Sequence, residues 1–252
     1  MIKDVVLLHA FPLDHRMWRD QQRALTAGGY RVLTPNYRGF GGNRQPLPTT
    51  PNLDTFADDV VTLLDECDIE RAVVGGLSLG GYVTLNLLRR YPDRLAGLIL
   101  ADTRADADGP AALATRLAFA DRVDAQGSDW VPAAVLPALL GAPAQADAAL
   151  VAELSAWIRG NDPAAIAWTQ RAMAARPDSF AALRAFDGPA LVLVGDEDAT
   201  TPVATVARIA AALPGAAPTR RFVQILSAGH LSAVEQPAAV TEVMLDWSTS
   251  LK

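Results

Sequence analysis

One stretch of nine residues, from Val73 to Gly81, constrains this chain more than any other. In it an apolar run ends at Ser78, Gly76 and Gly80 lie two residues to either side, and an amphipathic segment follows. Glycines at these positions leave room for a backbone that turns sharply and leaves the serine side chain exposed. The spacing therefore predicts a strand, a tight turn that presents a serine nucleophile, and a helix. The alternative is a serine in an ordinary Gly-rich turn.

Apolar runs and amphipathic segments alternate along much of the chain. Strands are expected at residues 5–8, 31–34, 73–77, 95–101, 190–194 and 221–226, and helices at 16–27, 53–67, 79–91, 201–213 and around 240–247. Thr201 is expected to cap its helix with its hydroxyl, with Pro202 in the first helical position. Strands that alternate with helices form parallel sheets with right-handed crossovers. We therefore predict an α/β fold with a mostly parallel sheet of about six strands and helices on both faces.

Residues 103–187 have a different character. They are rich in alanine, have no strand-like run, and are interrupted at 109–110, 127, 141–143, 161–163 and 176–177 by Gly, Pro and Asn. This pattern predicts an insertion of about four helices. Residues 1–102 and 188–252 are then expected to form one core domain.

Composition and missing motifs exclude several classes of function. The 22 Lys and Arg against 28 Asp and Glu give a net charge of -6 without a basic run, which argues against a nucleic-acid surface. The start has no signal-peptide pattern and no apolar run is long enough to span a bilayer, so we expect a cytoplasmic protein without membrane contact. No nucleotide-binding motif is present. The acidic stretch 104–109 would place Arg104 and Thr115 at ligand positions of a calcium loop, so we predict neither metal nor cofactor.

A serine needs a base that takes its proton and a third group that orients that base. Of three histidines, His230 directly follows the last predicted strand, at the sheet edge where Ser78 also lies. We predict that His230 is the base. His9 is expected to hold the backbone of its loop, and His15 to lie at the surface or at the rim of a pocket.

The orienting acid is expected at the same edge. Asp198 follows the strand at 190–194 and gives the order Ser78, Asp198, His230, whereas its neighbours Asp196 and Glu197 fit a turn. Asp102, at the end of the preceding strand, is an alternative that also reaches this edge. We predict Asp198 and keep Asp102 as the rival.

Four segments together resemble the α/β-hydrolase superfamily: residues 9–12, 76–81, 195–198 and 229–230. The likeness covers nearly the whole chain and is greatest to small capped esterases and lactonases, including enol-lactone hydrolases and cofactor-free perhydrolase-type enzymes. The resemblance implies that the insertion is a helical cap. It also implies an oxyanion hole made by the backbone N–H groups of Phe11 and Leu79. Relatives usually carry His-Gly where this chain has His9 and Ala10, and many place an antiparallel hairpin before the first parallel strand.

The function that this resemblance implies is hydrolysis of a small, moderately hydrophobic carboxylic ester or lactone through an acyl-enzyme. A hydroxynitrile lyase would need threonine and lysine where Ala10 and Leu231 stand, and dehalogenases or epoxide hydrolases need aspartate in place of Ser78. An enzyme that cleaves C–C bonds with the same triad, and a ligand receptor that retains it, remain alternatives.

The insertion supplies many large apolar residues, and some are expected to line the substrate pocket. An apolar pocket with a few polar groups is typical of small-molecule sites. An inward-pointing Arg116, Arg122 or Arg159 would add an anchor for a carboxylate. The predicted pocket residues are Trp130, Leu136, Trp157, Trp168 and Met173.

Overall fold

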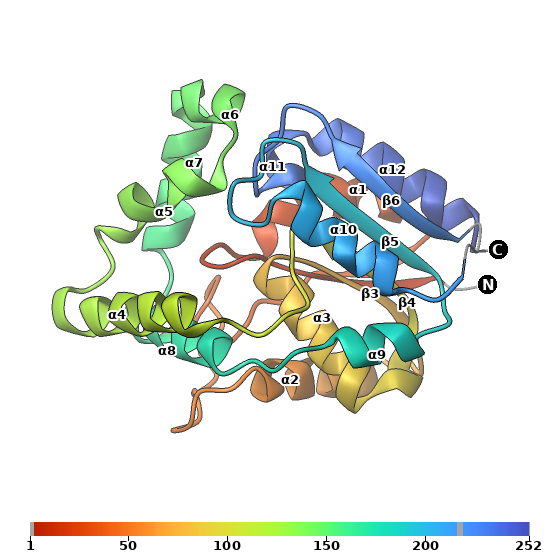
Figure 1. Cartoon of the computed structure of the whole chain (residues 1–252), viewed down its shortest axis with the longest axis horizontal. Coiled ribbons are helices and arrows are strands. Elements are labelled where there is room, and N and C mark those ends of the chain that lie inside the picture. The colour runs from red at the N-terminus through yellow and green to blue at the C-terminus, as the bar shows by residue number, and fades with distance from the viewer. Residues whose placement is uncertain (1–2, 216–218, 252) are drawn as a thin grey trace.

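The computed structural model describes residues 3–215 and 219–251; the predicted ends of the core domain, residues 1 and 252, lie outside this part. Within it, six strands form one sheet in the order β2-β1-β3-β4-β5-β6, and every adjacent pair is parallel (Figure 1). This confirms the predicted parallel sheet of about six strands. The strands are β1 (Asp4–Leu8), β2 (Arg31–Leu33), β3 (Ala72–Leu77), β4 (Leu95–Ala101), β5 (Ala190–Gly195) and β6 (Arg220–Ile225).

The three strands β3, β4 and β5 lie next to one another inside the sheet, and every one of their residues is buried. Strands covered on both faces read as continuous apolar runs, which is why the sequence located them well. The edge strands β2 and β6 are partly exposed. Strand β6 ends one residue before the predicted end, and Leu226 is 72% exposed.

Helices cover both faces of the sheet, as predicted (Figure 1). On one face α1 (Arg19–Ala27) packs against α12 (Pro237–Thr249). On the other lie α3 (Leu79–Arg90), α9 (Phe180–Ala185) and α10 (Val203–Ala212), with α2 (Asp54–Glu66) against α3. Three short helices complete the core: η1 (His15–Trp18), η2 (Pro92–Arg94) and α11 (Ser232–Glu235). The predicted helix 16–27 therefore begins with a 3-10 turn, in which the Asp14 side chain accepts the Arg16 N–H.

Residues 103–187 are all described, and they contain more helices than the expected four. Five gather beyond one end of the sheet (Figure 1): α4 (Pro110–Gln126), α5 (Val131–Leu139), α6 (Ala142–Ala146), α7 (Ala148–Arg159) and α8 (Pro163–Ala174). The break at Asp147, whose side chain accepts the N–H groups of Ala149 and Leu150 in the first turn of α7, was not predicted. The sixth helix, α9, packs on α3 and α10. Among the described residues, no helix has the length and apolar character needed to cross a membrane.

Candidate active site

Ser78 lies at the sharp turn between β3 and α3, as the spacing of its neighbouring glycines predicts. Its backbone angles, φ 56° and ψ -109°, are unfavourable for a residue with a side chain and persist only where the surroundings enforce them. A Cβ atom on Gly76 would lie 2.1 Å from the carbonyl carbon of Gly80, and one on Gly80 would lie 2.1 Å from the Leu8 carbonyl oxygen. The two glycines thus permit a close approach of three backbone segments, and this approach holds the turn.

The structure brings the side chains of Ser78, His230 and Asp198 into one hydrogen-bonded row. The Ser78 Oγ lies 2.8 Å from His230 Nε2, and His230 Nδ1 lies 2.9 Å from Asp198 Oδ2. His230 and Asp198 are buried, at 1% and 4% exposure, whereas Ser78 is partly exposed. Only the serine end of the row is therefore open to an incoming molecule.

The surroundings of Asp198 fix which nitrogen of His230 carries the proton. The N–H groups of Thr200 and Thr201 both donate to Oδ1 at 2.8 Å, and the Thr201 hydroxyl donates to Oδ2 at 2.5 Å. Burial acts to raise the pKa of Asp198, but the hydrogen bonds and charge of His230 and the Thr201 donors outweigh it, so this pKa lies below its usual value. An ionised carboxylate only accepts, so His230 donates from Nδ1 and its Nε2 is free to accept the serine proton.

Thr201 has a different role from the predicted one. Helix α10 begins at Val203 with Pro202 as its N-cap, and no side chain caps it. The prediction of a capping hydroxyl at Thr201 was therefore wrong, because that hydroxyl donates to Asp198 instead. The spacing of an aspartate and a threonine three residues later is the signal that could have located this contact.

The rival acid, Asp102, is fully buried but has other partners. Its Oδ1 accepts the Gly195 N–H at 2.8 Å, and its Oδ2 is hydrogen-bonded to the Ser232 hydroxyl. Burial, together with the negative charge of Asp198, raises the pKa of Asp102 well above its usual value. Asp102 thus joins β4, the end of β5 and α11, while Asp198 is the acid that contacts His230.

The backbone N–H groups of Phe11 and Leu79 are the predicted oxyanion donors. In residues 3–215 and 219–251, neither N–H donates to another protein group. Leu79 is the first residue of α3, where backbone N–H groups have no partner within the helix and favour negative charge. The oxyanion role itself stays a prediction.

His9 holds the loop that carries Phe11. Its Nε2 accepts the Tyr37 N–H at 3.3 Å, so its proton is on Nδ1, which lies 3.0 Å from the Ala10 carbonyl oxygen. Burial lowers the pKa of His9 to about 4, against the opposing effect of the bond to Ala10. His15 is 42% exposed and contacts the Asn36 side chain.

An aromatic row connects the Phe11 loop with the insertion. The centre of the Phe11 ring lies 6.5 Å from that of Phe40 and 6.1 Å from that of Phe119, and both pairs meet edge-to-face. The ring centres of Phe119 and Trp130 are 4.8 Å apart. Phe119 belongs to α4 and was missed, because α4 has no clear apolar stripe from which to single it out. Phe119 thus places an aromatic ring of the insertion against a predicted oxyanion residue.

Two of the predicted pocket residues attach the insertion to the core. Trp157 lies under the guanidinium groups of Arg16 and Arg19, 5.0 and 5.7 Å from its ring centre. Trp168 donates its indole N–H to the Pro48 carbonyl at 2.7 Å and contacts Phe56.

The other predicted pocket residues have partners within the insertion. Trp130 donates to the Gly127 carbonyl and lies under Arg122. Met173 is buried beside Arg116, which is paired with Asp108. Leu136 and Arg159 line a cavity of about 310 Å³ between α5 and α7. Contact of the five predicted residues with a substrate remains a prediction.

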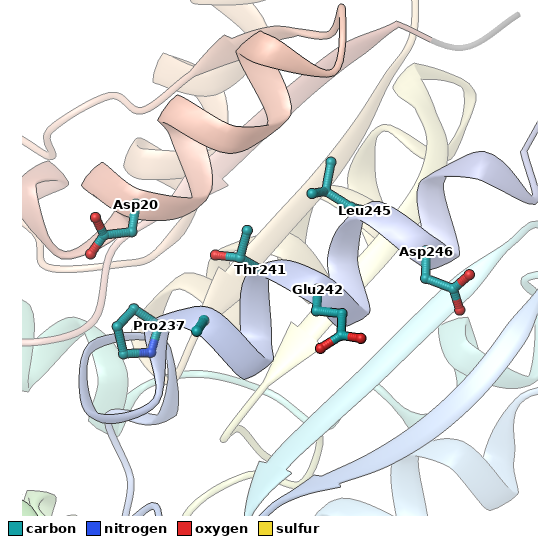
Figure 2. A pocket seen from close by; sticks show the side chains of 7 residues that line it. Asp20, Pro237, Thr241, Glu242, Leu245 and Asp246 are labelled. Atoms are coloured by element: carbon teal, nitrogen blue, oxygen red, sulfur yellow. The ribbon is translucent and has the colours of Figure 1, made fainter.

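A larger groove of about 770 Å³ lies away from these residues. It runs between α1, which provides Asp20, and α12, which provides Pro237, Thr241, Glu242 and Leu245 (Figure 2). None of Ser78, Asp198 and His230 lines it. Over the described ranges, no three His, Cys, Asp or Glu side chains are grouped so that they could hold a metal ion.

Known proteins resemble this chain over nearly its full length. A family model described as the alpha/beta hydrolase fold matches residues 4–237. An esterase from Thermogutta terrifontis, solved with bound malate, has a TM-score of 0.92 at 37% identity, and the match covers 98% of this chain and 90% of that one. An enol-lactonase from Burkholderia xenovorans has a TM-score of 0.87 at 29% identity, with 99% and 92% covered.

Curated relatives include proteins named as peroxidases. A Mycobacterium tuberculosis protein named non-heme bromoperoxidase BpoC is 29% identical over an alignment of 252 positions, which covers 94% of this chain and 90% of that one. A Synechocystis protein named as a non-heme chloroperoxidase is 39% identical over 97 residues, 38% of this chain. That shorter match spans only 35% of the Synechocystis protein.

Proposed function

This chain belongs to the α/β-hydrolase family, and on that basis we propose that it is a serine hydrolase that cleaves a small, moderately hydrophobic carboxylic ester or lactone. The observation that carries the proposal is the continuous row from Ser78 Oγ through His230 to Asp198, with distances of 2.8 and 2.9 Å. A nucleophile, a base within hydrogen-bond reach and an orienting acid are the parts that acyl transfer requires.

In the first half of the proposed reaction, His230 Nε2 takes the proton of Ser78 as Oγ attacks the ester carbonyl carbon. The carbonyl oxygen becomes negative, and the N–H groups of Phe11 and Leu79 stabilise it. Asp198 accepts from Nδ1 and stabilises the imidazolium that forms. His230 then gives its proton to the leaving alcohol oxygen, the C–O bond breaks, and the acyl group stays on Ser78.

In the second half, water repeats the same steps. His230 takes a proton from the water, the resulting oxygen attacks the acyl carbon, and the bond to Ser78 Oγ breaks as Oγ regains its proton from His230. A lactone follows the same course, but its alcohol remains joined to the acid product.

The substrate class rests on the environment of Phe11 and on the relatives. The aromatic row formed by Phe11, Phe119 and Trp130 offers an apolar wall from the insertion beside the proposed oxyanion hole. The two solved relatives are titled an esterase and an enol-lactonase. The aromatic row supports a moderately hydrophobic acyl compound, and the two titles support an ester or a lactone.

The test is turnover of p-nitrophenyl esters of increasing acyl length, and of a matching set of lactones, by wild-type protein and a Ser78→Ala variant. We expect activity on short and medium chains that the variant lacks, and a changed chain-length preference in Phe119→Ala. Equal activity of wild type and Ser78→Ala would refute the proposal. A wild type that binds these compounds without turning them over would favour the receptor alternative.

The names of two relatives suggest a second acyl acceptor. Hydrogen peroxide in place of water would attack the same acyl-enzyme and release a peracid. Peracid formation from peroxide and an ester, compared between wild type and Ser78→Ala, measures how much of the acyl-enzyme reacts with peroxide instead of water.

A further inference from the structure

The C-terminal end of α5 and the residues after it contact both loops that carry the proposed acid and base. The Leu139 carbonyl oxygen accepts the N–H of His230 at 2.9 Å and that of Leu231 at 3.2 Å. The Ala138 carbonyl oxygen accepts the Thr200 hydroxyl at 3.0 Å, two residues from Asp198. The insertion is therefore bonded directly to the backbone of the base.

One carboxylate completes this attachment. Glu235 Oε2 accepts the N–H of Gly229 at 3.0 Å and that of Gly141 at 2.7 Å, while Oε1 accepts the N–H of Leu231 at 3.0 Å. Glu235 thus binds the residues immediately before and after His230 and, with the same group, the turn between α5 and α6. Three consecutive N–H groups, from residue 229 to residue 231, are held by Glu235 and Leu139 together.

The backbones at this point touch. A Cβ atom on Gly229 would lie 2.3 Å from the Gly141 nitrogen, so no side chain separates the two segments. Burial raises the pKa of Glu235, and the three N–H donors act in the opposite direction. Hydrogen bonds to an ionised carboxylate are about twice as strong as neutral ones, which suits a single group that must hold two segments.

We propose that Glu235 is a positioning residue for the base: by binding residues 229, 231 and 141 at once, it fixes His230 in register with Ser78 and couples the insertion to the triad. This role rests on the proposed function, since it concerns the base of that reaction. A displacement of about 1 Å of a catalytic group can cost about a hundredfold in rate. Nothing in the role requires Glu235 to touch a substrate.

The test compares Glu235→Ala and Glu235→Gln with a control matched to the first, Glu197→Ala. In the described residues, the Glu197 carboxylate accepts only the Ala142 N–H, at 2.7 Å, so the control loses an insertion contact without loosening the His230 loop. We expect kcat to fall roughly 10- to 100-fold in Glu235→Ala with KM within about threefold of wild type. Glu235→Gln keeps one acceptor oxygen and should lose less, and Glu197→Ala should stay within about twofold.

Hydrogen-deuterium exchange of the same proteins measures, without any substrate, how firmly the backbones of the two segments are held. Peptides covering residues 138–142 and 229–231 should both exchange faster in the two Glu235 variants, whereas only the first should change in Glu197→Ala. A lower melting temperature with unchanged kcat, or a lower kcat with unchanged exchange, would overturn the inference. A wild type without ester turnover defeats the proposed function, and the exchange comparison still decides whether Glu235 couples the two segments.

Discussion

Replacing Asp198 by asparagine should disable the base through its tautomer while preserving the shape of the site. The N–H groups of Thr200 and Thr201 both donate to Oδ1, so in the variant the amide oxygen must take that position. The amide NH2 then stands at the Oδ2 position, 2.9 Å from His230 Nδ1. An NH2 group donates, so Nδ1 must become the acceptor, the proton moves to Nε2, and His230 can no longer accept the proton of Ser78.

The size of this effect follows from the loss of general-base catalysis. A wrong histidine tautomer costs roughly four orders of magnitude in kcat, which is about 5.5 kcal/mol in activation free energy. The assay is steady-state hydrolysis of p-nitrophenyl butyrate, with near-ultraviolet circular dichroism to check the fold. KM should change far less than kcat, because the side chain stays in place.

The matched control is Asp102→Asn. Asp102 is also buried, but it bonds to the Gly195 N–H and the Ser232 hydroxyl, and its raised pKa favours the protonated carboxyl, which an amide resembles in charge. We expect a loss of less than about tenfold in kcat. If Asp102→Asn proves the more damaging of the two, or if Asp198→Asn retains more than about a tenth of wild-type turnover, the tautomer argument is refuted.

Three further predictions concern the base, the turn and the loop histidine. Ser78→Ala and His230→Ala should each abolish turnover, and the double variant should be hardly worse, because the two groups act as a unit; additive losses would contradict this. Gly80→Ala should lower the free energy of unfolding in urea by about 3 kcal/mol, whereas Gly109→Ala, with open space at its Cβ position, should leave it nearly unchanged. The pKa of His9 is lowered from 6.5 to about 4, so the neutral ring contributes about 3 kcal/mol to the free energy of unfolding above pH 6.5, and this contribution is lost as the pH falls to 4. A His9→Gln variant with an equally steep loss of stability over this window would disprove the assignment.

The sequence predicted the sheet and the serine turn well because both depend on local patterns. Strand β3 is an uninterrupted buried run, and the glycines around Ser78 are required by contacts only a few residues away or with the adjoining β1 strand. The structure brings His230 beside Ser78, because the loops after parallel strands meet at one edge of the sheet.

The choice between Asp198 and Asp102 was harder from sequence. Both follow central strands, and only the three-dimensional arrangement shows that Asp102 bonds across to the end of β5 while Asp198 reaches Nδ1 of His230. The wrong prediction for Thr201 has a similar origin, since a threonine that precedes a proline can either cap a helix or donate its hydroxyl to an aspartate. The two candidate partners of this hydroxyl were a backbone N–H of the helix and the Asp198 carboxylate, and in the structure it donates to the carboxylate.

The insertion shows why pocket residues are the least predictable part of such a chain. Its large side chains have to satisfy packing within the insertion, attachment to the core and contact with a substrate, and composition does not separate these tasks. Trp157 and Trp168 contact core residues, and Phe119, on a helix with no evident apolar face, lies against the Phe11 ring. From the core side, Glu235 binds the turn after α5. Because the Leu139 carbonyl binds the backbone N–H of His230, a shift of the insertion at this point would also move the proposed base. Variation in substrate preference is therefore expected at α4, where Phe119 meets the Phe11 ring, and not at the end of α5, where the Leu139 carbonyl binds the N–H groups of His230 and Leu231.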